Sequence, residues 1–209
     1  IIMAHGDDQG LKLPPAIAPT QVVIIPIIPK NADSEKILKL ANQIKERLSD
    51  LRVHLDDREE VSPGFKFNEW ELKGVPIRLE LGPKDIENNS VVVARRDIEN
   101  SKTSIPINTL DTEITSLLDT IQNEMLKVSE QFLTDNTSHA ESMDELLKQL
   151  QDSDGFVSCY WSESKEDELR VKEQTKATIR CYPLEHTNEM SSVNKPEIQG
   201  KFAIFSKSY

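Results

Sequence analysis

The chain has 209 residues, of which 37% are hydrophobic and 29% are charged, and its formal net charge is −11. This length and apolar content support one large or two small folded domains and exclude a disordered chain. No apolar run approaches the roughly 18 residues that a membrane-spanning helix needs. The two cysteines, Cys159 and Cys181, cannot build a disulfide framework, which favours a reducing setting.

Charge is unevenly distributed along the chain. Residues 58–96 carry 7 basic and 7 acidic side chains, whereas residues 97–209 carry 11 and 21. An acidic surface disfavours nucleic acid as a partner. Because the excess acidity lies mainly in the C-terminal half, a local RNA-binding surface in the middle of the chain is still compatible with the overall charge.

The first third of the chain predicts alternating strands and helices. Residues 1–4 are expected to end a strand, and a turn-rich loop follows them. Residues 21–28 are almost continuously apolar and β-branched, which is typical of a strand buried on both faces of a largely parallel sheet. Asp33 and Ser34 can cap a helix of about five turns. Its apolar stripe consists of Ile37, Ala41, Ile44, Leu48 and Leu51. Residues 52–57 predict a second strand.

Residues 63–97 predict a helix, a strand, a turn and a second strand with little spare chain between them. Pro63 suits the first turn of a helix, and Gly74 suits the position just after its end. Residues 77–81 alternate between apolar and charged, so one face of this strand is expected to be buried and the other charged. Gly82 and Pro83 predict a turn. Residues 90–94 form an apolar strand that ends at Arg95 and Arg96.

The remainder of the chain predicts a long helix and a small α+β unit. Apolar residues recur at intervals of three and four from Ile114 to Phe132, as in an amphipathic helix. A second short helix is expected around residues 143–150. Strands are predicted near residues 155–161, 176–185 and 201–209, with a charged helix over residues 163–174 and a polar loop over residues 186–199.

Several stretches resemble the prolyl-tRNA synthetase family of the archaeal and eukaryotic type. They are HGDDQGLKLPP, QVVIIPI, PGFKFNEWELKGVPIRLELGPKD, VVVARRD and the terminal KSY. The resemblance implies an α/β fold, with a mixed, mostly parallel sheet flanked by helices, as in class II anticodon-binding domains, and then a small α+β domain. The implied segments are residues 1–19, the end of the catalytic domain; 20–119, the anticodon-binding domain; 120–140, a linking helix; and 141–209, the C-terminal domain.

The resemblance also implies the activity of the complete protein. Such an enzyme activates proline with ATP and Mg²⁺, charges proline tRNA, is cytoplasmic rather than membrane-bound, and is expected to be a homodimer. This chain would hold only a remnant of the third catalytic motif, at His5, Gly6 and Asp7, and would be inactive alone. A turn rich in Asp and Gly is the simpler account of these three residues. The carboxylate of Tyr209 would lie near the active site, unless the side chain is a plain C-terminal anchor.

The implied RNA partner is the anticodon, which carries guanines at its second and third positions. A guanine edge offers N–H donors to a carboxylate and an O6 acceptor to a basic side chain. The candidate readers are Arg58, Lys66, Glu69, Lys73, Arg78, Glu80, Lys84 and Arg95. The alternative is an ordinary helix pair between Glu69 and Lys73 and a solvated strand face at Arg78 and Glu80.

Two departures from the family pattern bear on function. At Ala16 the resemblance implies an arginine that contacts ATP phosphates, and a methyl group cannot replace its donors. This substitution motivates an alternative, a non-catalytic RNA-binding paralogue. The family's C-terminal domain often holds zinc on four cysteines, and only Cys159 matches a ligand position. We therefore expect no zinc, and no other cofactor in this chain.

Overall fold

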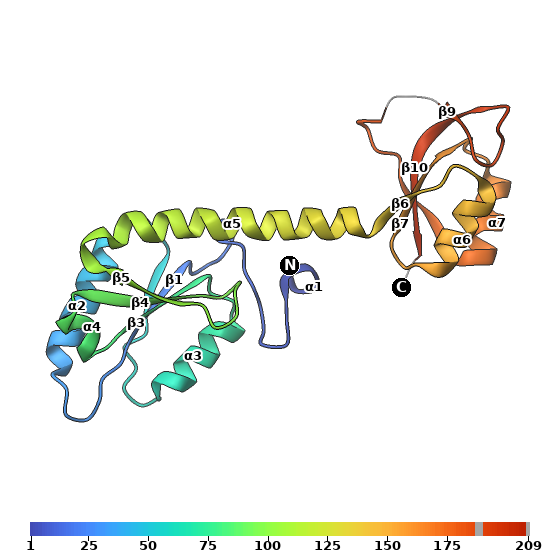
Figure 1. Ribbon diagram of the computed structural model, residues 1–209. Coiled ribbons are helices and arrows are strands. Elements are labelled where there is room, and N and C mark those ends of the chain that lie inside the picture. Colours follow the sequence, from blue (N-terminus) through green and yellow to red (C-terminus); the bar gives the residue numbers. More distant parts are fainter. Residues whose placement is uncertain (187–189, 208–209) are drawn as a thin grey trace. The chain divides into compact units, whose positions relative to one another are not determined.

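The computed structural model describes residues 1–186 and 190–207, and the chain divides into two compact units, Ile1–Ser129 and Glu130–Tyr209 (Figure 1). Each unit has its own hydrophobic core. The helix α5 (Leu110–Asp135) begins in the first unit and continues into the second. It confirms the long helix predicted from the apolar repeat.

The first unit is built on a mixed sheet with the strand order β2-β1-β3-β4-β5. The strand β1 pairs in parallel with β2 and β3, while β4 is antiparallel to both β3 and β5. The mixed sheet flanked by helices is therefore confirmed. The strands are β1 (Val22–Pro26), β2 (Val53–Leu55), β3 (Ile77–Leu81), β4 (Ser90–Arg95) and β5 (Lys102–Pro106). The helices are α1 (Ile2–His5), α2 (Ser34–Arg47), α3 (Pro63–Leu72), α4 (Pro83–Glu87), the 3-10 turn η1 (Ile107–Thr109) and α5.

Helices cover the two faces of this sheet unequally. Alternate residues of β1, Val22 and Ile24, face a large core formed with α2 and α5, whereas Val23 and Ile25 face α3. All five β1 residues are buried, as the continuous apolar run predicts. In Figure 1, α3 lies on the opposite side of the sheet from α5. Because α3 packs on β1 and its neighbourhood, the same face is left open over β4 and β5.

Local sequence signals explain where the helices begin. The Asp33 carboxylate caps α2 by accepting a hydrogen bond from the Lys36 backbone at 3.1 Å. The Ser62 hydroxyl caps α3 by accepting from the Phe65 backbone at 3.3 Å, and Pro63 occupies the first helical turn. The helix α2 ends at Arg47, before the last residue of the predicted stripe, Leu51.

Three local predictions were wrong or incomplete. Residues 1–4 were expected in a strand, but Ile2–His5 is a helical turn. The predicted turn at Gly82 and Pro83 is the start of α4, because Pro83 fits a first helical turn and the Asp85 carboxylate accepts from the Gly82 N–H at 2.8 Å. The strand β5 was missed because it is a polar edge strand with little apolar alternation.

Two backbone hydrogen bonds join the segment 7–13 to the end of α3, close to Gly10 and Gly74. Leu11 N–H donates to the Leu72 carbonyl at 3.0 Å, and Leu13 N–H donates to the Gly74 carbonyl at 3.1 Å. Gly10 and Gly74 have φ values of 126° and 72°. A Cβ at Gly10 would lie 2.7 Å from the Leu72 carbonyl oxygen. The close approach therefore requires glycine on both sides.

We expect Gly74→Ala to lower the free energy of unfolding of the first unit by about 2 kcal/mol or more. A left-handed residue with a Cβ costs roughly 1–2 kcal/mol, and this Cβ would also lie 2.6 Å from the Leu11 Cβ. Urea unfolding measures the loss. The control is Gly64→Ala within α3, where a Cβ meets nothing within 4 Å and should be neutral or stabilising. Equal stability of the two variants would contradict the requirement for glycine.

The second unit is an α+β fold with the strand order β6-β7-β10-β8, and β9 pairs with β10. Its core contains Trp161, Phe205, Leu146 and Leu150. The polar segment β6 was not predicted. The elements are β6 (Thr137–His139), α6 (Met143–Asp152), β7 (Phe156–Trp161), α7 (Lys165–Thr175), β8 (Ala177–Cys181), β9 (Met190–Ser191) and β10 (Gln199–Lys207). Among the described residues, no helix is both long and apolar enough to cross a membrane.

Candidate nucleic-acid interface

A basic pocket opens on the sheet face that α3 leaves uncovered. Its volume is about 140 Å³. Trp70 and Glu71 of α3 form one wall, and Arg78 of β3 and Lys102 of β5 form another. Arg95 and Arg96 approach from the end of β4 because antiparallel pairing brings that end beside the start of β3, with Arg95 opposite Ile77. We call this cavity the base pocket. Its complete lining is Val23, Trp70, Glu71, Val75, Arg78, Ala94, Arg95, Arg96, Ile98, Asn100, Ser101 and Lys102.

Ion pairs hold most cations of the base pocket in place. Arg78 donates to the Glu80 carboxylate at 3.1 Å, and Lys102 donates to the other oxygen of Glu80 at 2.9 Å. Arg78 and Lys102 also lie over the Phe67 ring, at 4.4 and 5.4 Å from its centroid. Glu80 is 6% exposed, so the charged face of β3 is packed rather than solvated. The Phe67 ring and the Glu80 carboxylate therefore hold both cations in fixed positions.

Arg95 is held from two sides. It donates to the Asp97 carboxylate through two nitrogens, at 3.0 and 2.5 Å, and it contacts Glu124 of α5 as well. Hydrogen bonds from Arg95 to Asp97 raise the pKa of the guanidinium above its ordinary value, so it is cationic at all working pH values.

Glu71 is the acidic member of the base pocket. Within the described part of the chain, no hydrogen bond or ion pair engages its carboxylate, and its backbone carbonyl accepts from the Arg96 guanidinium at 3.0 Å. The pocket therefore combines one carboxylate with several cations. This combination matches a planar ligand that has both donors and acceptors on its edges.

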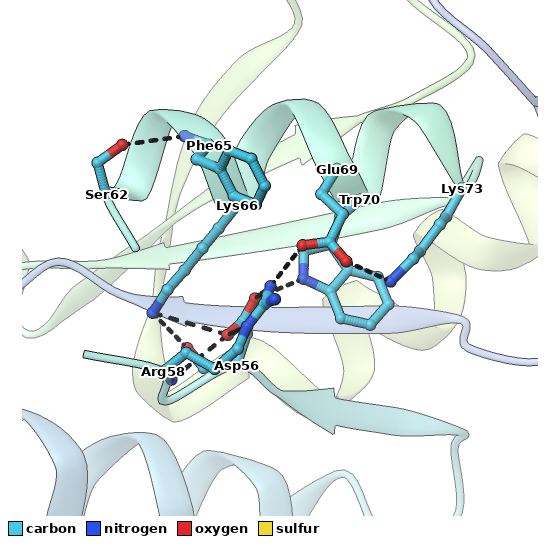
Figure 2. A network of polar contacts seen from close by, with 8 residues as sticks. All are labelled: Asp56, Arg58, Ser62, Phe65, Lys66, Glu69, Trp70 and Lys73. Atoms are coloured by element: carbon cyan, nitrogen blue, oxygen red, sulfur yellow. Dashed lines mark hydrogen bonds and ion pairs between the residues drawn. The ribbon is translucent and has the colours of Figure 1, made fainter. Parts of the chain in front are cut away.

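A separate network lies at the other side of α3 and centres on Asp56 (Figure 2). The buried Asp56 carboxylate accepts from Arg58 at 2.8 and 2.7 Å and from the Trp70 indole at 2.7 Å. Arg58 reaches on to Glu69 at 2.6 Å, and Glu69 pairs with Lys73 at 2.7 Å. The Lys66 amine, 5% exposed, donates to the Asp56 backbone carbonyl at 3.0 Å. The network fastens α3 to the end of β2.

Opposing effects set the pKa of the Asp56 carboxyl. Burial acts to raise it, but hydrogen bonds from Arg58 and Trp70 and the charge of Lys66 outweigh burial and hold the pKa well below its usual range. The carboxylate is therefore ionised wherever the unit is folded. Trp70 is a packed residue of the α3 core with its indole N–H engaged, and core packing describes it better than an open stacking surface.

The structure divides the eight candidate RNA-binding residues among three places. Arg58, Lys66, Glu69 and Lys73 belong to the Asp56 network. Arg78 and Arg95 line the base pocket, and Glu80 supports it from below. Lys84 is exposed on α4, beyond the end of β3. Lys66 is buried, and its amine is engaged by the Asp56 backbone carbonyl.

The pocket also contains residues that the sequence reading did not select, chiefly Glu71 and Lys102. Lys102 was missed because β5 was not predicted. Glu71 could have been found from topology, since α3 leads through Gly74 into β3 and the end of β4 must lie beside that junction. Helical spacing predicts a pair between Glu69 and Lys73, and these residues lie on the opposite face of α3.

The three residues assigned to the catalytic remnant lie at the start of the first unit. His5 ends α1 and Gly6 follows it. Asp7 accepts two hydrogen bonds from Arg96, and these bonds hold the pKa of its carboxyl well below its usual range. Tyr209 lies outside the described residues. The Ala16 backbone N–H donates a hydrogen bond to the Gln122 side chain, and the Ala16 carbonyl accepts one from the Arg52 guanidinium.

The described residues do not fit a zinc or magnesium centre. In the parts of the chain that the structure describes, no three His, Cys, Asp or Glu side chains gather as metal ligands. Cys159 is buried in the second core and Cys181 is exposed. Burial raises the pKa of Cys159 to about 12, so this thiol is protonated at neutral pH.

Comparison with known protein families identifies both units. The family described as "Anticodon binding domain" matches residues 21–117, and "Prolyl-tRNA synthetase, C-terminal" matches residues 143–209.

Curated relatives and solved structures agree. The chain is 45% identical to a proline–tRNA ligase of Roseiflexus sp. (strain RS-1) over 90% of its own length and 40% of the relative. It is 44% identical to the chloroplastic/mitochondrial proline–tRNA ligase of Arabidopsis thaliana, over 100% of the chain and 40% of the relative. The crystal structure of prolyl-tRNA synthetase from Cryptosporidium parvum with L-proline and AMP aligns with a TM-score of 0.89 at 36% identity, covering 100% of this chain and 45% of that one. The chain thus spans less than half the length of these relatives.

Proposed function

The chain belongs to the prolyl-tRNA synthetase family, as its C-terminal portion, and we propose that its first unit selects proline tRNA by binding an anticodon guanine in the base pocket. The observation that carries the proposal is that Glu71, whose carboxylate has no partner among the described residues, lines the same cavity as Arg78 and Lys102. The match of residues 21–117 to the anticodon-binding family supports the same location.

The chemistry of guanine accounts for this residue set. The N1–H and N2–H groups donate side by side, and a carboxylate such as Glu71 accepts both. The O6 and N7 atoms are acceptors, which suit Arg78 and Lys102. Adenine presents an amino group in place of O6 and lacks N1–H, so it would face Glu71 with an acceptor and the cations with a donor. The pocket therefore distinguishes guanine from adenine by the positions of hydrogen-bond donors and acceptors on the edge of the base.

The proposal gives the other candidate RNA-binding residues different roles. Arg95 borders the pocket but is held by Asp97 and by Glu124 of α5, and Glu80 holds Arg78 and Lys102 in position. Arg58, Glu69 and Lys73 form a partly exposed rim beside α3 that suits a second base or the phosphate backbone, as does Lys84. Lys66 supports the rim through Asp56 rather than touching RNA.

The complete protein is proposed to activate proline with ATP and Mg²⁺ and to charge proline tRNA. Those cofactors would be held by the part of the enzyme that carries the other catalytic motifs, as the resemblance implies. We keep the segments proposed from the sequence: 1–19 as the end of the catalytic domain, 20–119 for anticodon binding, 120–140 as a linking helix and 141–209 as the C-terminal domain. Cytoplasmic location and a homodimer of the complete protein belong to the same proposal. The relatives named as ligases do not favour the alternative of a non-catalytic paralogue.

The test is binding of the 209-residue chain to a proline tRNA anticodon stem–loop. Replacing both anticodon guanines with adenine is expected to weaken binding at least about tenfold, since each mismatched hydrogen-bonding edge costs on the order of 1–3 kcal/mol. A fluorescence titration at fixed salt measures both affinities, and the fixed salt keeps the phosphate contribution equal. Equal affinity for the two RNAs would refute the proposal.

A further inference from the structure

Asp7 connects the segment before the anticodon-binding unit to the base pocket. Its carboxylate accepts from the two terminal nitrogens of Arg96, at 3.0 and 2.5 Å, in a bidentate pair. Lys12 lies 3.0 Å from the same carboxylate, and the Gln9 backbone N–H donates to it at 2.9 Å. These contacts fix the carboxylate in one orientation.

Arg96 is the link between this carboxylate and the pocket. Its side chain is 5% exposed, it lines the base pocket, and its Nε donates to the Glu71 backbone carbonyl. One guanidinium therefore contacts the loop through its terminal nitrogens and the pocket's acidic residue through its third nitrogen. The Gly10 and Gly74 junction holds the two chain segments together at the same place.

We infer that Asp7 is a positioning residue for guanine selection, which acts by keeping the Arg96 guanidinium away from the Glu71 carboxylate. The inference rests on the proposed function of the base pocket. A buried arginine that lost its carboxylate partner would require another one, because an uncompensated buried cation is costly. Glu71 lies beside it in the pocket, and none of the described residues forms a hydrogen bond or an ion pair with its carboxylate. Pairing of Arg96 with Glu71 would remove the acceptor that a guanine edge needs.

This role differs from simple structural support in what it predicts. If Asp7 only stabilised the fold, its loss would weaken binding of all RNAs alike. If it protects Glu71, its loss weakens binding only of RNA that carries the guanines. The effect would also disappear in a chain whose Glu71 carboxylate has already been removed.

The experiment measures binding of the 209-residue chain to the guanine and the adenine-substituted anticodon stem–loops. Asp7→Asn is expected to weaken guanine binding about five- to tenfold, with little change for the substituted RNA. Asp8→Asn is the matched control, since it changes the charge equally at the neighbouring exposed residue. In a Glu71→Gln background, Asp7→Asn is expected to have no further effect, which a double-mutant cycle detects. A thermal melt reports whether each variant is folded.

Arg96→Lys provides a second route if Asp7→Asn fails to fold, because lysine keeps the positive charge but cannot hold Asp7 and the Glu71 carbonyl together. It should reproduce the loss of guanine preference. The inference is overturned if Asp7→Asn binds the guanine RNA like Asp8→Asn, or if Asp7→Asn weakens binding of both RNAs equally. It is also overturned if the effects of Asp7→Asn and Glu71→Gln on the binding free energy are additive. Absence of guanine preference in the unmodified chain would instead refute the proposed function, and the inference with it.

Discussion

Glu71→Gln is expected to lower the affinity of the chain for the proline tRNA anticodon stem–loop by about 100-fold. The carboxylate of Glu71 can accept both N–H donors of a guanine, whereas an amide accepts one and opposes the other with its own donor. Hydrogen bonds to a charged group are worth roughly 1.5–3 kcal/mol, and every 1.4 kcal/mol corresponds to about tenfold in affinity. A titration of the variant against the unmodified chain measures the ratio.

The side chains of Glu71 and glutamine have nearly the same shape, so the fold should be retained. The matched control is Glu87→Gln on α4, which removes the same charge from an exposed position. Binding of the adenine-substituted RNA should change little in either variant. If Glu71→Gln binds the guanine RNA as well as Glu87→Gln does, then Glu71 does not read the base and the pocket assignment is wrong.

Asp56→Ala is expected to destabilise the first unit by about 3–5 kcal/mol, the range found when one partner of a buried ion pair is removed. The substitution leaves the Trp70 indole and the nearly buried Lys66 amine without their acidic partner. Hydrogen exchange of β1 and β3 amides reports the stability of this unit separately from the other. The control is Asp57→Ala, the adjacent exposed aspartate. A loss as small as that of the control would mean that the Asp56 network does not fasten α3.

Two ion-paired aspartates, Asp56 and Asp7, make the first unit sensitive to acid. The folded-state pKa values of Asp56 and Asp7 are depressed, so their stabilisation is present above the unfolded-state pKa of about 4 and is lost as the pH falls below it. The Asp56→Ala variant should therefore show a smaller loss of stability between about pH 5 and pH 2 than the unmodified chain. A parallel decline of both chains would indicate that other carboxylates control the acid transition.

Much of the fold follows from local patterns in the sequence. The continuous apolar run predicts the buried β1, the 3.6-residue period predicts α2 and α5, and Pro63 with Gly74 delimits α3. The errors occurred where local signals are weak or ambiguous. The edge strand β5 is polar because one side faces solvent, and Gly82–Pro83 is equally compatible with a turn and with a helix start.

The sequence by itself determined the family and the stretch in which RNA recognition was expected, because an uninterrupted string of matching residues requires no knowledge of contacts. Only the tertiary structure decided which charges meet. Antiparallel pairing of β3 with β4 brings Arg96 to Glu71, and β5 adds Lys102, at separations along the chain that periodicity cannot relate. Burial likewise decided that Lys66 supports Asp56, and the fold places Glu71 in the lining of the pocket. Residue type gives the chemistry that a side chain can perform, but its partners and its access to solvent are properties of the folded chain.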